Sequence, residues 1–273
     1  MSKLNTIKSK VKQVEAIFAS KPYKIGIALS GGGIKGMCHA GVLKALEEEG
    51  IKPDLISGVS AGAVVGALYA DGYLPDEIAT IFEHVEFRKM TKLQVPDGGF
   101  FSTERFEKYL GSKLRAKTFE ELKIPLRIVT TNLDKGESVT FSKGELLPVI
   151  MASSSIPVLF SPRKIDGEHY VDGGVFKNFP VSVIRQDCEN VIGVNASPLV
   201  INEYKKSILS VAMRTYHFMF KANSMADKDM CDLLIEPIDV GNYDTFDTEK
   251  SREIFNLGYD ITKKMIDDRK NMK

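Results

Sequence analysis

The stretch "SGVSAGAVVG", residues 57–66, places Ser60 between Gly58 and Gly62. Inside a regular helix or strand each glycine would cost stability, because glycine has the most backbone freedom to lose on folding. The G-x-S-x-G spacing is instead typical of a serine held on a tight turn between a strand and a helix. Ser60 is therefore a candidate nucleophile, provided that the rest of the chain supplies a base and an oxyanion site.

A second glycine turn precedes this one. The apolar run "YKIGIALS" predicts a buried strand, "GGGIKG" at 31–36 a turn, and "MCHAGVLKALEEEG" a helix that ends at Gly50. "PDLISGVS" then predicts a short strand and "AGAVVGALYADG" a helix that ends at Gly72. Strand, glycine turn and helix, repeated in this way, indicate an α/β fold with a parallel sheet.

The remaining patterns complete a single α/β domain, since we find neither internal repeats nor a flexible linker. Further strands are expected at "LRIVTTNL", "SVTFS", "EHYVDGG", "NVIGVNA" and "DLLIEP". Further helices are expected at about 75–91, 102–114, 144–151 and 203–225, from Pro180, and from about 248. We divide the chain into an N-terminal amphipathic helix (1–23), a catalytic core (24–200) and a C-terminal helical extension packed on the same domain (201–273).

The first twenty residues carry an apolar stripe surrounded by lysines, formed by Leu4, Ile7, Val11, Val14 and Phe18. We expect this helix to dock on the body of the protein, because the stripe is narrow and has no tryptophan. A basic amphipathic helix that rests on a membrane surface is the alternative.

The composition excludes several classes of protein. A formal net charge of +1 gives no reason to expect a nucleic-acid partner. Three scattered cysteines form neither a metal-ligand spacing nor a disulfide framework, so we expect a cytoplasmic protein without a metal. The lysine-rich N-terminus lacks the apolar core of a secretory signal, and the most apolar stretch is too short to span a bilayer.

The first glycine turn has two possible uses. Gly31, Gly33 and Gly36 match the dinucleotide fingerprint G-x-G-x-x-G, but the second strand ends in "GVS" rather than in the acidic residue that would hold a ribose. An oxyanion hole fits better, because consecutive glycines Gly31, Gly32 and Gly33 let backbone N–H groups converge at the start of a helix. Lys35 adds positive potential nearby.

None of the four histidines is a convincing base for Ser60. His39 follows the glycine turn inside a helix, and His84 ends a helical pattern. His169 lies within a strand, and His217 lies within the apolar helix "MRTYHFMF". Asp172 is the better candidate, because it ends a strand and Gly173 and Gly174 then allow a sharp turn. The same tripeptide at Asp97 follows a proline, and we interpret it as an ordinary turn.

With these residues assembled, the chain resembles the patatin-like phospholipases. The matching stretches are "GGGIKG" (31–36), "GVSAG" (58–62), "ASSSIP" (152–157) and "DGGVFKNFPV" (172–181), in the order that the family shows. The resemblance covers roughly residues 24–195. It implies a three-layer α/β/α fold with a mainly parallel central sheet, Ser60 as nucleophile, Asp172 as base and no catalytic histidine. It also makes Gly31, Gly32 and Gly33 the oxyanion loop, with Lys35, Gly36, Gly58, Gly62, Gly173 and Gly174 in supporting positions.

The resemblance implies a lipid acyl hydrolase that needs no cofactor and acts on lipid or phospholipid esters. A membrane or micelle surface is the expected source of substrate, so the protein is expected in the cytoplasm or peripherally at a membrane. A Ser-His-Asp esterase for small esters, with His217 as base, and a non-catalytic lipid- or nucleotide-binding module remain alternatives. We expect the acyl chain to contact Phe100, Phe101, Met213, Phe218, Met219 and Phe220, although an ordinary core helix would explain 213–220 equally well.

Overall fold

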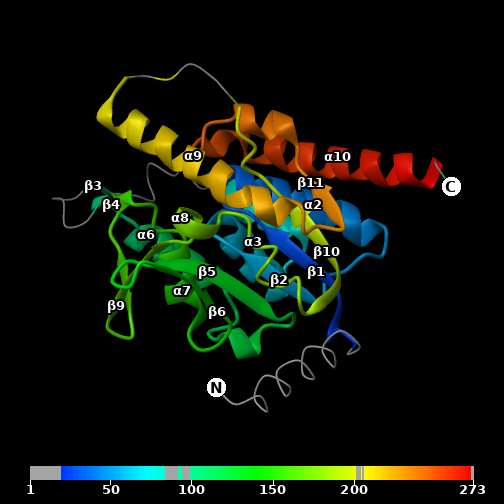
Figure 1. The fold of residues 1–273 in the computed structure, drawn as a ribbon, viewed down its shortest axis with the longest axis horizontal. Coiled ribbons are helices and arrows are strands. Elements are labelled where there is room, and N and C mark those ends of the chain that lie inside the picture. The colour runs from blue at the N-terminus through cyan, green and yellow to red at the C-terminus, as the bar shows by residue number, and fades with distance from the viewer. Residues whose placement is uncertain (1–19, 84–91, 94–98, 201–203, 205, 272–273) are drawn as a thin grey trace, which may run out of the picture.

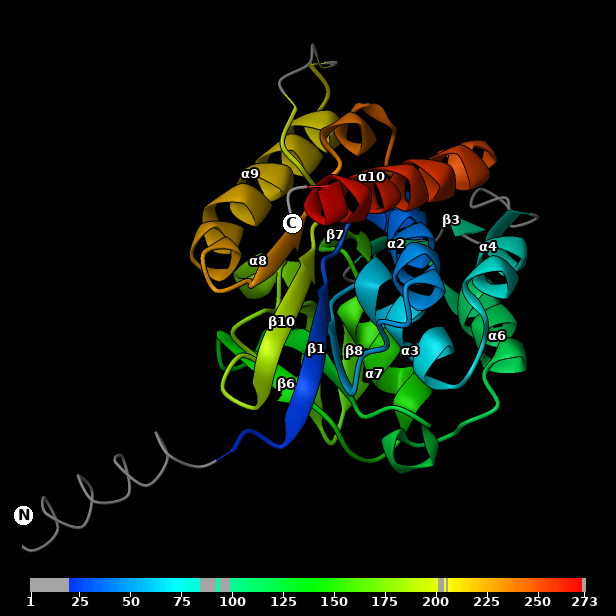
Figure 2. The same ribbon diagram turned by 90° about the vertical axis from the view of Figure 1, so that its right-hand side faces the viewer.

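The computed structural model describes residues 20–83, 92–93, 99–200, 204 and 206–271. They form a mixed eight-stranded sheet between two layers of helices (Figures 1 and 2), and a separate three-stranded sheet, β3-β4-β7. The strands are β1 (Tyr23–Leu29), β2 (Leu55–Gly58), β3 (Lys92–Leu93), β4 (Gly99–Ser102), β5 (Leu126–Asn132), β6 (Glu137–Phe141), β7 (Val158–Phe160), β8 (Arg163–Ile165), β9 (Glu168–Asp172), β10 (Cys188–Val194) and β11 (Leu233–Ile235). The α-helices are α2 (Met37–Glu48), α3 (Ala61–Ala70), α4 (Pro75–Glu83), α6 (Glu104–Lys113), α7 (Leu146–Ser153), α8 (Gly174–Lys177), α9 (Ile208–Lys228) and α10 (Ser251–Asn271). Short 3-10 helices lie at η1 (Gly33–Gly36), η2 (Phe119–Glu121), η3 (Ile238–Asn242) and η4 (Thr248–Lys250).

The central sheet is mainly parallel, as expected. Its order is β11-β10-β1-β2-β5-β9-β8, with β6 paired to β5, and strands β11 to β5 along this order are all parallel. Strands β6, β9 and β8 add antiparallel pairs at the far end. Figure 2 shows α8 and α9 on one side of the sheet and α2, α3 and α4 on the other.

Strand β5 holds three neighbours on two edges. Strand β6 pairs with residues 128–132 of β5, whereas β2 pairs with 126–128 and β9 with 130–132. Because a strand has only two edges, β2 and β9 must both lie on the edge opposite β6, end to end. Gly58 at the end of β2 pairs with Ile128, and Asp172 at the end of β9 pairs with Thr130. The carboxyl ends of the two strands therefore point at each other across Val129.

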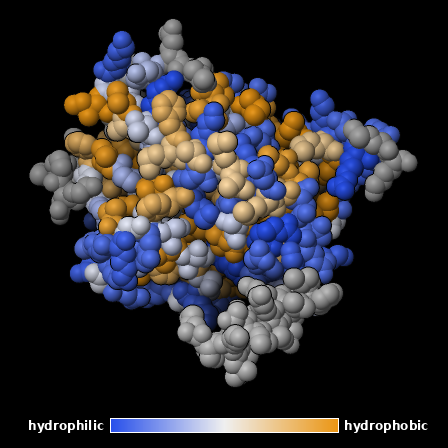
Figure 3. Space-filling view, in the orientation of Figure 1, coloured by the Kyte–Doolittle hydropathy of each residue, from blue (hydrophilic) through white to orange (hydrophobic). Residues whose placement is uncertain are grey.

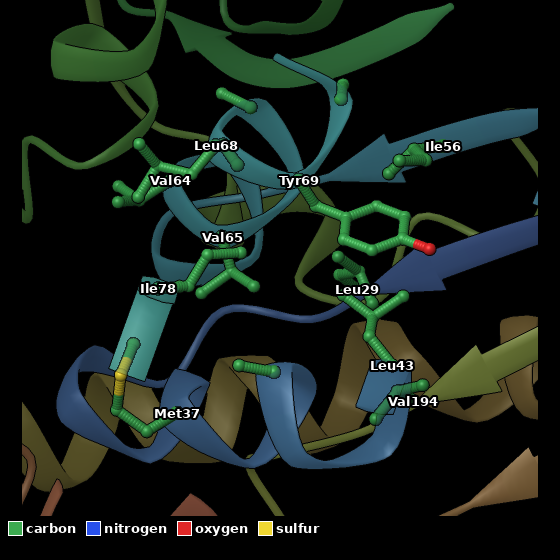
Figure 4. Packing of buried hydrophobic residues seen from close by; sticks show 14 of the residues in the cluster. Leu29, Met37, Leu43, Ile56, Val64, Val65, Leu68, Tyr69, Ile78 and Val194 are labelled. Atoms are coloured by element: carbon green, nitrogen blue, oxygen red, sulfur yellow. The ribbon is translucent and has the colours of Figure 1, made fainter. Parts of the chain in front are cut away.

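Alternating residues of β1 and β2 fill two different cores. Ile27, Leu29 and Ile56 are buried against α2 and α3 in the larger core, which Figure 4 shows from close by. Ala28 and Leu55 face the other side, where Phe179 is completely buried with them. This alternation is the period-2 pattern of a strand that is covered on both faces.

Helix α10 packs directly on α2. A Cβ on Gly41 would lie 1.9 Å from the backbone oxygen of Phe255, and a Cβ on Gly258 would lie 2.3 Å from the oxygen of Cys38. Glycines at these two positions let the helix backbones approach each other closely. The division of the chain into three segments stays a prediction, and residues 1–19 lie outside the described part.

The structure differs from the expected elements in several places. The expected helix from Pro180 is wrong: the helical turn is α8, before the proline, and residues 182–187 form turns. A proline suits the first turn of a helix, but here the preceding Phe179 is completely buried in the smaller core. Strands β7 and β8 gave no clear signal because each has only three residues. The expected helix at 75–91 is described only as far as Glu83, and Asp97 lies outside the described residues.

We predict that Gly41→Ala destabilises the protein by about 2 kcal/mol, because the new methyl group meets backbone that cannot move independently. Gly66→Ala in α3 is the matched control. Its Cβ would meet the side chain of Ile56 at 3.1 Å, and the gain in helix propensity of about 1 kcal/mol offsets that crowding. Chemical unfolding of both variants measures the difference; equal stabilities would contradict this account of the α2–α10 contact.

Candidate active site

Ser60 stands on a sharp turn between β2 and α3. Its φ of 52° and ψ of −121° are sparsely populated by a non-glycine residue, a conformation that costs about 1–3 kcal/mol. Gly58 and Gly62 are needed for this turn, since a Cβ on Gly58 would lie 2.5 Å from the oxygen of Gly62. A Cβ on Gly62 would lie 2.2 Å from the oxygen of Leu29. The spacing thus produces the turn that the sequence predicts.

Ser153, at the end of α7, holds the turn in place. Its hydroxyl accepts a hydrogen bond from the Ser60 N–H at 2.8 Å and donates one to the carbonyl of Val129 at 2.7 Å. Two residues later the carbonyl of Ser155 accepts a hydrogen bond from the Asp172 N–H at 2.9 Å. The "ASSSIP" stretch therefore braces both candidate catalytic residues. No local pattern in the sequence indicates this role for Ser153.

Asp172 is completely buried at the end of β9, directly beside the Ser60 turn. Its Oδ1 accepts a hydrogen bond from the N–H of Gly174 at 2.8 Å, whereas Oδ2 has no partner of ordinary hydrogen-bond geometry among the described residues. Burial raises the pKa of Asp172 to about 6, and polar interactions with Ser60, Gly174 and Tyr216 offset part of that rise. The free Oδ2 is thus available to accept a proton.

Gly173 and Gly174 each fill a position that a side chain could not. A Cβ on Gly173 would lie 2.4 Å from the carbonyl oxygen of Val129, and one on Gly174 would lie 3.0 Å from Oδ1 of Asp172. The tight turn after β9 keeps the aspartate carboxyl against the sheet.

The glycine loop of residues 31–33 lies against the same turn. The Gly31 N–H is already engaged, since it donates to the carbonyl of Asn178 at 3.1 Å. Gly33 has a φ of +61°, in the left-handed region that favours glycine, and Ile34 donates to the carbonyl of Thr245 at 2.9 Å. Gly36 lies on Ala61, since a Cβ there would approach the Cβ of Ala61 to 2.6 Å. The loop is therefore packed against the start of α3.

Lys35 and His217 border the glycine loop on its other side. Together with Gly32 and Ser197 they line a small polar pocket. Burial lowers the pKa of Lys35, and nearby Asp244 opposes that effect. Burial, with the positive charge of Lys35 as a smaller cause, lowers the pKa of His217 to about 4, so its ring is neutral at pH 7.

The histidines are the alternatives to Asp172 as the base. His217 shares a cavity wall with Ser60 and Asp172, but no hydrogen bond to either is present among the described residues. His39 is buried and bonds through Nε2 to the carbonyl of Ser30 at 2.8 Å, which indicates a structural role. His169 is exposed and lies beside Asp134. His84 lies outside the described residues.

An apolar cavity of about 110 Å³ opens next to Ser60. Its wall is formed by the helices beside the serine and by the segment 245–248. It includes Met37, Val64, Phe106, Phe160 and Phe246. The residues expected to contact an acyl chain divide into two groups. Met213 and Phe220 face the catalytic cavity and Phe101 packs beside them, whereas Phe100, Phe218 and Met219 are exposed.

A comparison with family models matches residues 27–184 to the patatin-like phospholipase model. The chain belongs to the patatin-like phospholipase family. The matched range holds Ser60, Asp172 and the glycine loop, and it covers more than half of the sequence.

Several curated relatives support the same assignment. This patatin-like chain is 36% identical over 176 residues to an uncharacterized NTE family protein of Mycobacterium tuberculosis, which covers 63% of this chain and 47% of that protein. It is 31% identical to the uncharacterized protein YqhO of Bacillus subtilis, covering 66% of this chain and 73% of that one. It is 27% identical to the lysophospholipase NTE1 of Kluyveromyces lactis, covering 86% of this chain but only 18% of that protein. The chain thus spans about half the length of the mycobacterial relative.

The fold agrees with a solved structure. VipD from Legionella pneumophila superposes with a TM-score of 0.60 at 16% identity, covering 92% of this chain and 68% of that one. In the part of this patatin-like chain that the structure describes, no helix is long and apolar enough to cross a membrane, and no cluster of side chains is suited to a metal ion.

We predict that Ser153→Ala lowers kcat about tenfold or more with little change in KM. The substitution leaves the Ser60 N–H and the Val129 carbonyl buried without their partner, at a cost of about 1–3 kcal/mol for each group. Ser155→Ala is the control, because among the described residues that hydroxyl bonds only to the carbonyl of Met151, at 2.8 Å. Steady-state kinetics on a soluble ester measure both variants, and equal effects would show that the Ser153 brace does not position Ser60.

Proposed function

We propose that the protein is a phospholipase A-like serine hydrolase that cleaves fatty-acyl esters through a Ser60–Asp172 dyad. One observation carries the proposal: a serine on a strained turn and a buried carboxyl with a free Oδ2 meet at one point of the sheet. Strain and unpaired buried polar groups concentrate at functional sites, where surrounding structure holds them.

The chemistry runs in two steps. Oδ2 of Asp172 accepts the Ser60 proton while the serine oxygen attacks the ester carbonyl carbon, and the protonated aspartate then gives its proton to the departing alcohol. In the second step water attacks the acyl-enzyme and loses a proton to Asp172. The bond between the acyl group and the Ser60 oxygen then breaks, Asp172 returns the proton to that oxygen, and the fatty acid departs. Because Oδ1 is held by Gly174, the carboxyl keeps one oxygen fixed and one reactive.

The oxyanion is assigned to the N–H groups of Gly32 and Gly33. Gly31 was expected to share this role, but its N–H donates to Asn178, so we leave it out of the donor set. The partial positive charge at the start of α3 adds favourable potential at the same place, and Lys35 borders the loop on its other side. No metal or organic cofactor takes part in this scheme.

The apolar cavity beside Ser60 supports an acyl chain as the substrate group. Its lining is almost entirely hydrocarbon, and methionine and aromatic side chains adapt to a flexible chain. Two of the more similar curated relatives are named lysophospholipases, which is consistent with a lipid ester rather than a small soluble one.

A fluorophosphonate probe tests the nucleophile. We expect the wild-type protein to be labelled and Ser60→Ala, still folded, to be neither labelled nor active. His217→Ala should keep activity within about tenfold, because a dyad does not use the ring. A folded His217→Ala protein without activity would instead favour the Ser-His-Asp esterase, and an unlabelled wild-type protein would favour a binding module. Rates on esters of increasing acyl length then separate lipid esterase from small-ester activity.

We predict that Asp172→Asn loses most activity and yet stabilises the fold above pH 6. General-base help is worth roughly 100- to 10,000-fold in rate, and an amide cannot accept the proton. The folded protein holds the Asp172 carboxyl at a pKa of about 6, above its unfolded value, so ionisation of this group disfavours folding.

The loss of stability caused by ionisation of Asp172 depends on pH. The penalty is absent below about pH 4, grows as pH rises through about 6, and reaches roughly 3 kcal/mol when the carboxyl is fully ionised. Thermal melts of the wild type and Asp172→Asn at pH 4 and pH 8 measure it. In the same window kcat/KM of the wild type should rise with pH. A variant that is less stable than the wild type at pH 8 would contradict the buried, destabilising carboxylate.

A further inference from the structure

Helix α9 has two opposite faces with different roles. Met213, Tyr216, His217 and Phe220 face inward and line the cavity that contains Ser60 and Asp172. On the other side Ile208, Val211, Phe218 and Met225 are exposed to solvent, with exposed fractions of 93%, 47%, 46% and 61%. At 100° per residue these four side chains fall within an arc of about 100° around the helix. Figure 3 shows hydrophobic residues on this side, over the position that α9 has in Figure 1.

The charge of this segment has a single sign. From Tyr204 to Ala226 the sequence contains Lys205, Lys206, Arg214 and Lys221 and no aspartate or glutamate. The guanidinium of Arg214 stacks over the rings of Tyr204 and Phe218, at 4.5 and 5.4 Å from their centroids. The first carboxylate, Asp227, is buried and lies beside Lys177. Cations beside an exposed apolar stripe suit an anionic lipid surface, whereas the rest of this near-neutral protein has mixed charge.

The helix is also tied firmly to the catalytic turn. The side chain of Asn223 donates to the carbonyl of Gly174 at 2.8 Å and accepts from the N–H of Asn178 at 3.0 Å. Its partner Gly174 is the residue whose N–H holds Asp172. One helix diameter, about 10 Å, therefore separates the outer face from the wall of the site.

We propose that the outer face of α9, formed by Ile208, Val211, Phe218 and Met225 with Arg214 and Lys221, docks on the surface of an anionic lipid bilayer. This inference deepens the proposed function, since it rests on a lipid substrate and says where the protein meets it. The apolar stripe enters the boundary between headgroups and acyl chains, the cations face the anionic headgroups, and the inner face receives the acyl chain.

Vesicle flotation of the full chain tests the docking surface. Ser60→Ala serves as the background, so that the vesicles stay intact. Phe218→Gln with Met225→Gln should lower partitioning onto phosphatidylcholine–phosphatidylglycerol vesicles about tenfold or more, because two anchoring side chains no longer enter the lipid. Leu133→Gln, at an exposed position (49%) outside α9, is the matched control and should bind like the background protein.

The charge contribution has its own test. Lys221→Glu should weaken binding to the vesicles that contain phosphatidylglycerol but not to pure phosphatidylcholine, and Lys264→Glu on α10 should change neither. Added salt should weaken only the anionic case. Equal binding of all these variants would overturn the proposal, as would α9 variants that alter self-association in sedimentation while leaving vesicle binding unchanged.

A second readout keeps the proposal testable if the double variant fails to fold. A fluorophore on Ile208→Cys should be quenched by brominated lipid, whereas one on Lys264→Cys should not, and quenching of neither would overturn the proposal. Hydrolysis of a soluble short-chain ester, measured with Ser60 intact, should be unaffected by Phe218→Gln and Met225→Gln. Loss of vesicle binding with full soluble-ester activity therefore separates this inference from the hydrolase assignment, which fails only if the wild type lacks that activity.

Discussion

The site depends on two strands that share one edge of β5 and meet with their carboxyl ends facing each other. Strand β2 ends opposite Ile128 of β5, β9 runs in the opposite direction and ends opposite Thr130, and the carbonyl of Val129 lies between them. That carbonyl accepts the Ser153 hydroxyl and leaves no room for a side chain on Gly173. The antiparallel strand at the end of a parallel sheet therefore brings Asp172 beside the turn that carries Ser60.

This arrangement places two groups that each lower the stability of the fold next to each other, and the surrounding structure holds them in place. Ser60 has a strained backbone, and Asp172 has a buried carboxyl, one oxygen of which has no partner of ordinary hydrogen-bond geometry among the described residues. Neither would persist on a mobile loop. Both are fixed instead by hydrogen bonds with the end of α7 and the first residue of α8, on a scaffold that contains two buried hydrophobic cores. The rest of the fold thus holds the strained turn and the buried carboxyl side by side.

The sequence predicted the individual residues of the candidate site better than their arrangement in space. Ser60, Asp172 and the parallel strands followed from glycine turns and apolar runs, because these signals are local. The family assignment confirmed the resemblance drawn from the four motifs. The head-to-head strands were not predictable in this way, since the pairing of β9 with β5 joins residues about forty positions apart. The roles of Ser153 and Asn223, and the hydrogen bond that occupies Gly31, depend on the same kind of distant contact. The helix expected at Pro180 failed because burial of Phe179 overrides a weak local preference.

The hydrogen bond from Ile34 to Thr245 joins the glycine loop to a residue more than two hundred positions later. The family model ends at residue 184, before this contact and before strand β10, which pairs with the whole length of β1. A ribosome that has made the serine, the aspartate and all the recognisable motifs has therefore not yet made the residues that support the loop. The glycine loop therefore gains its full support only after residue 245 has been made, well after the motifs that it serves.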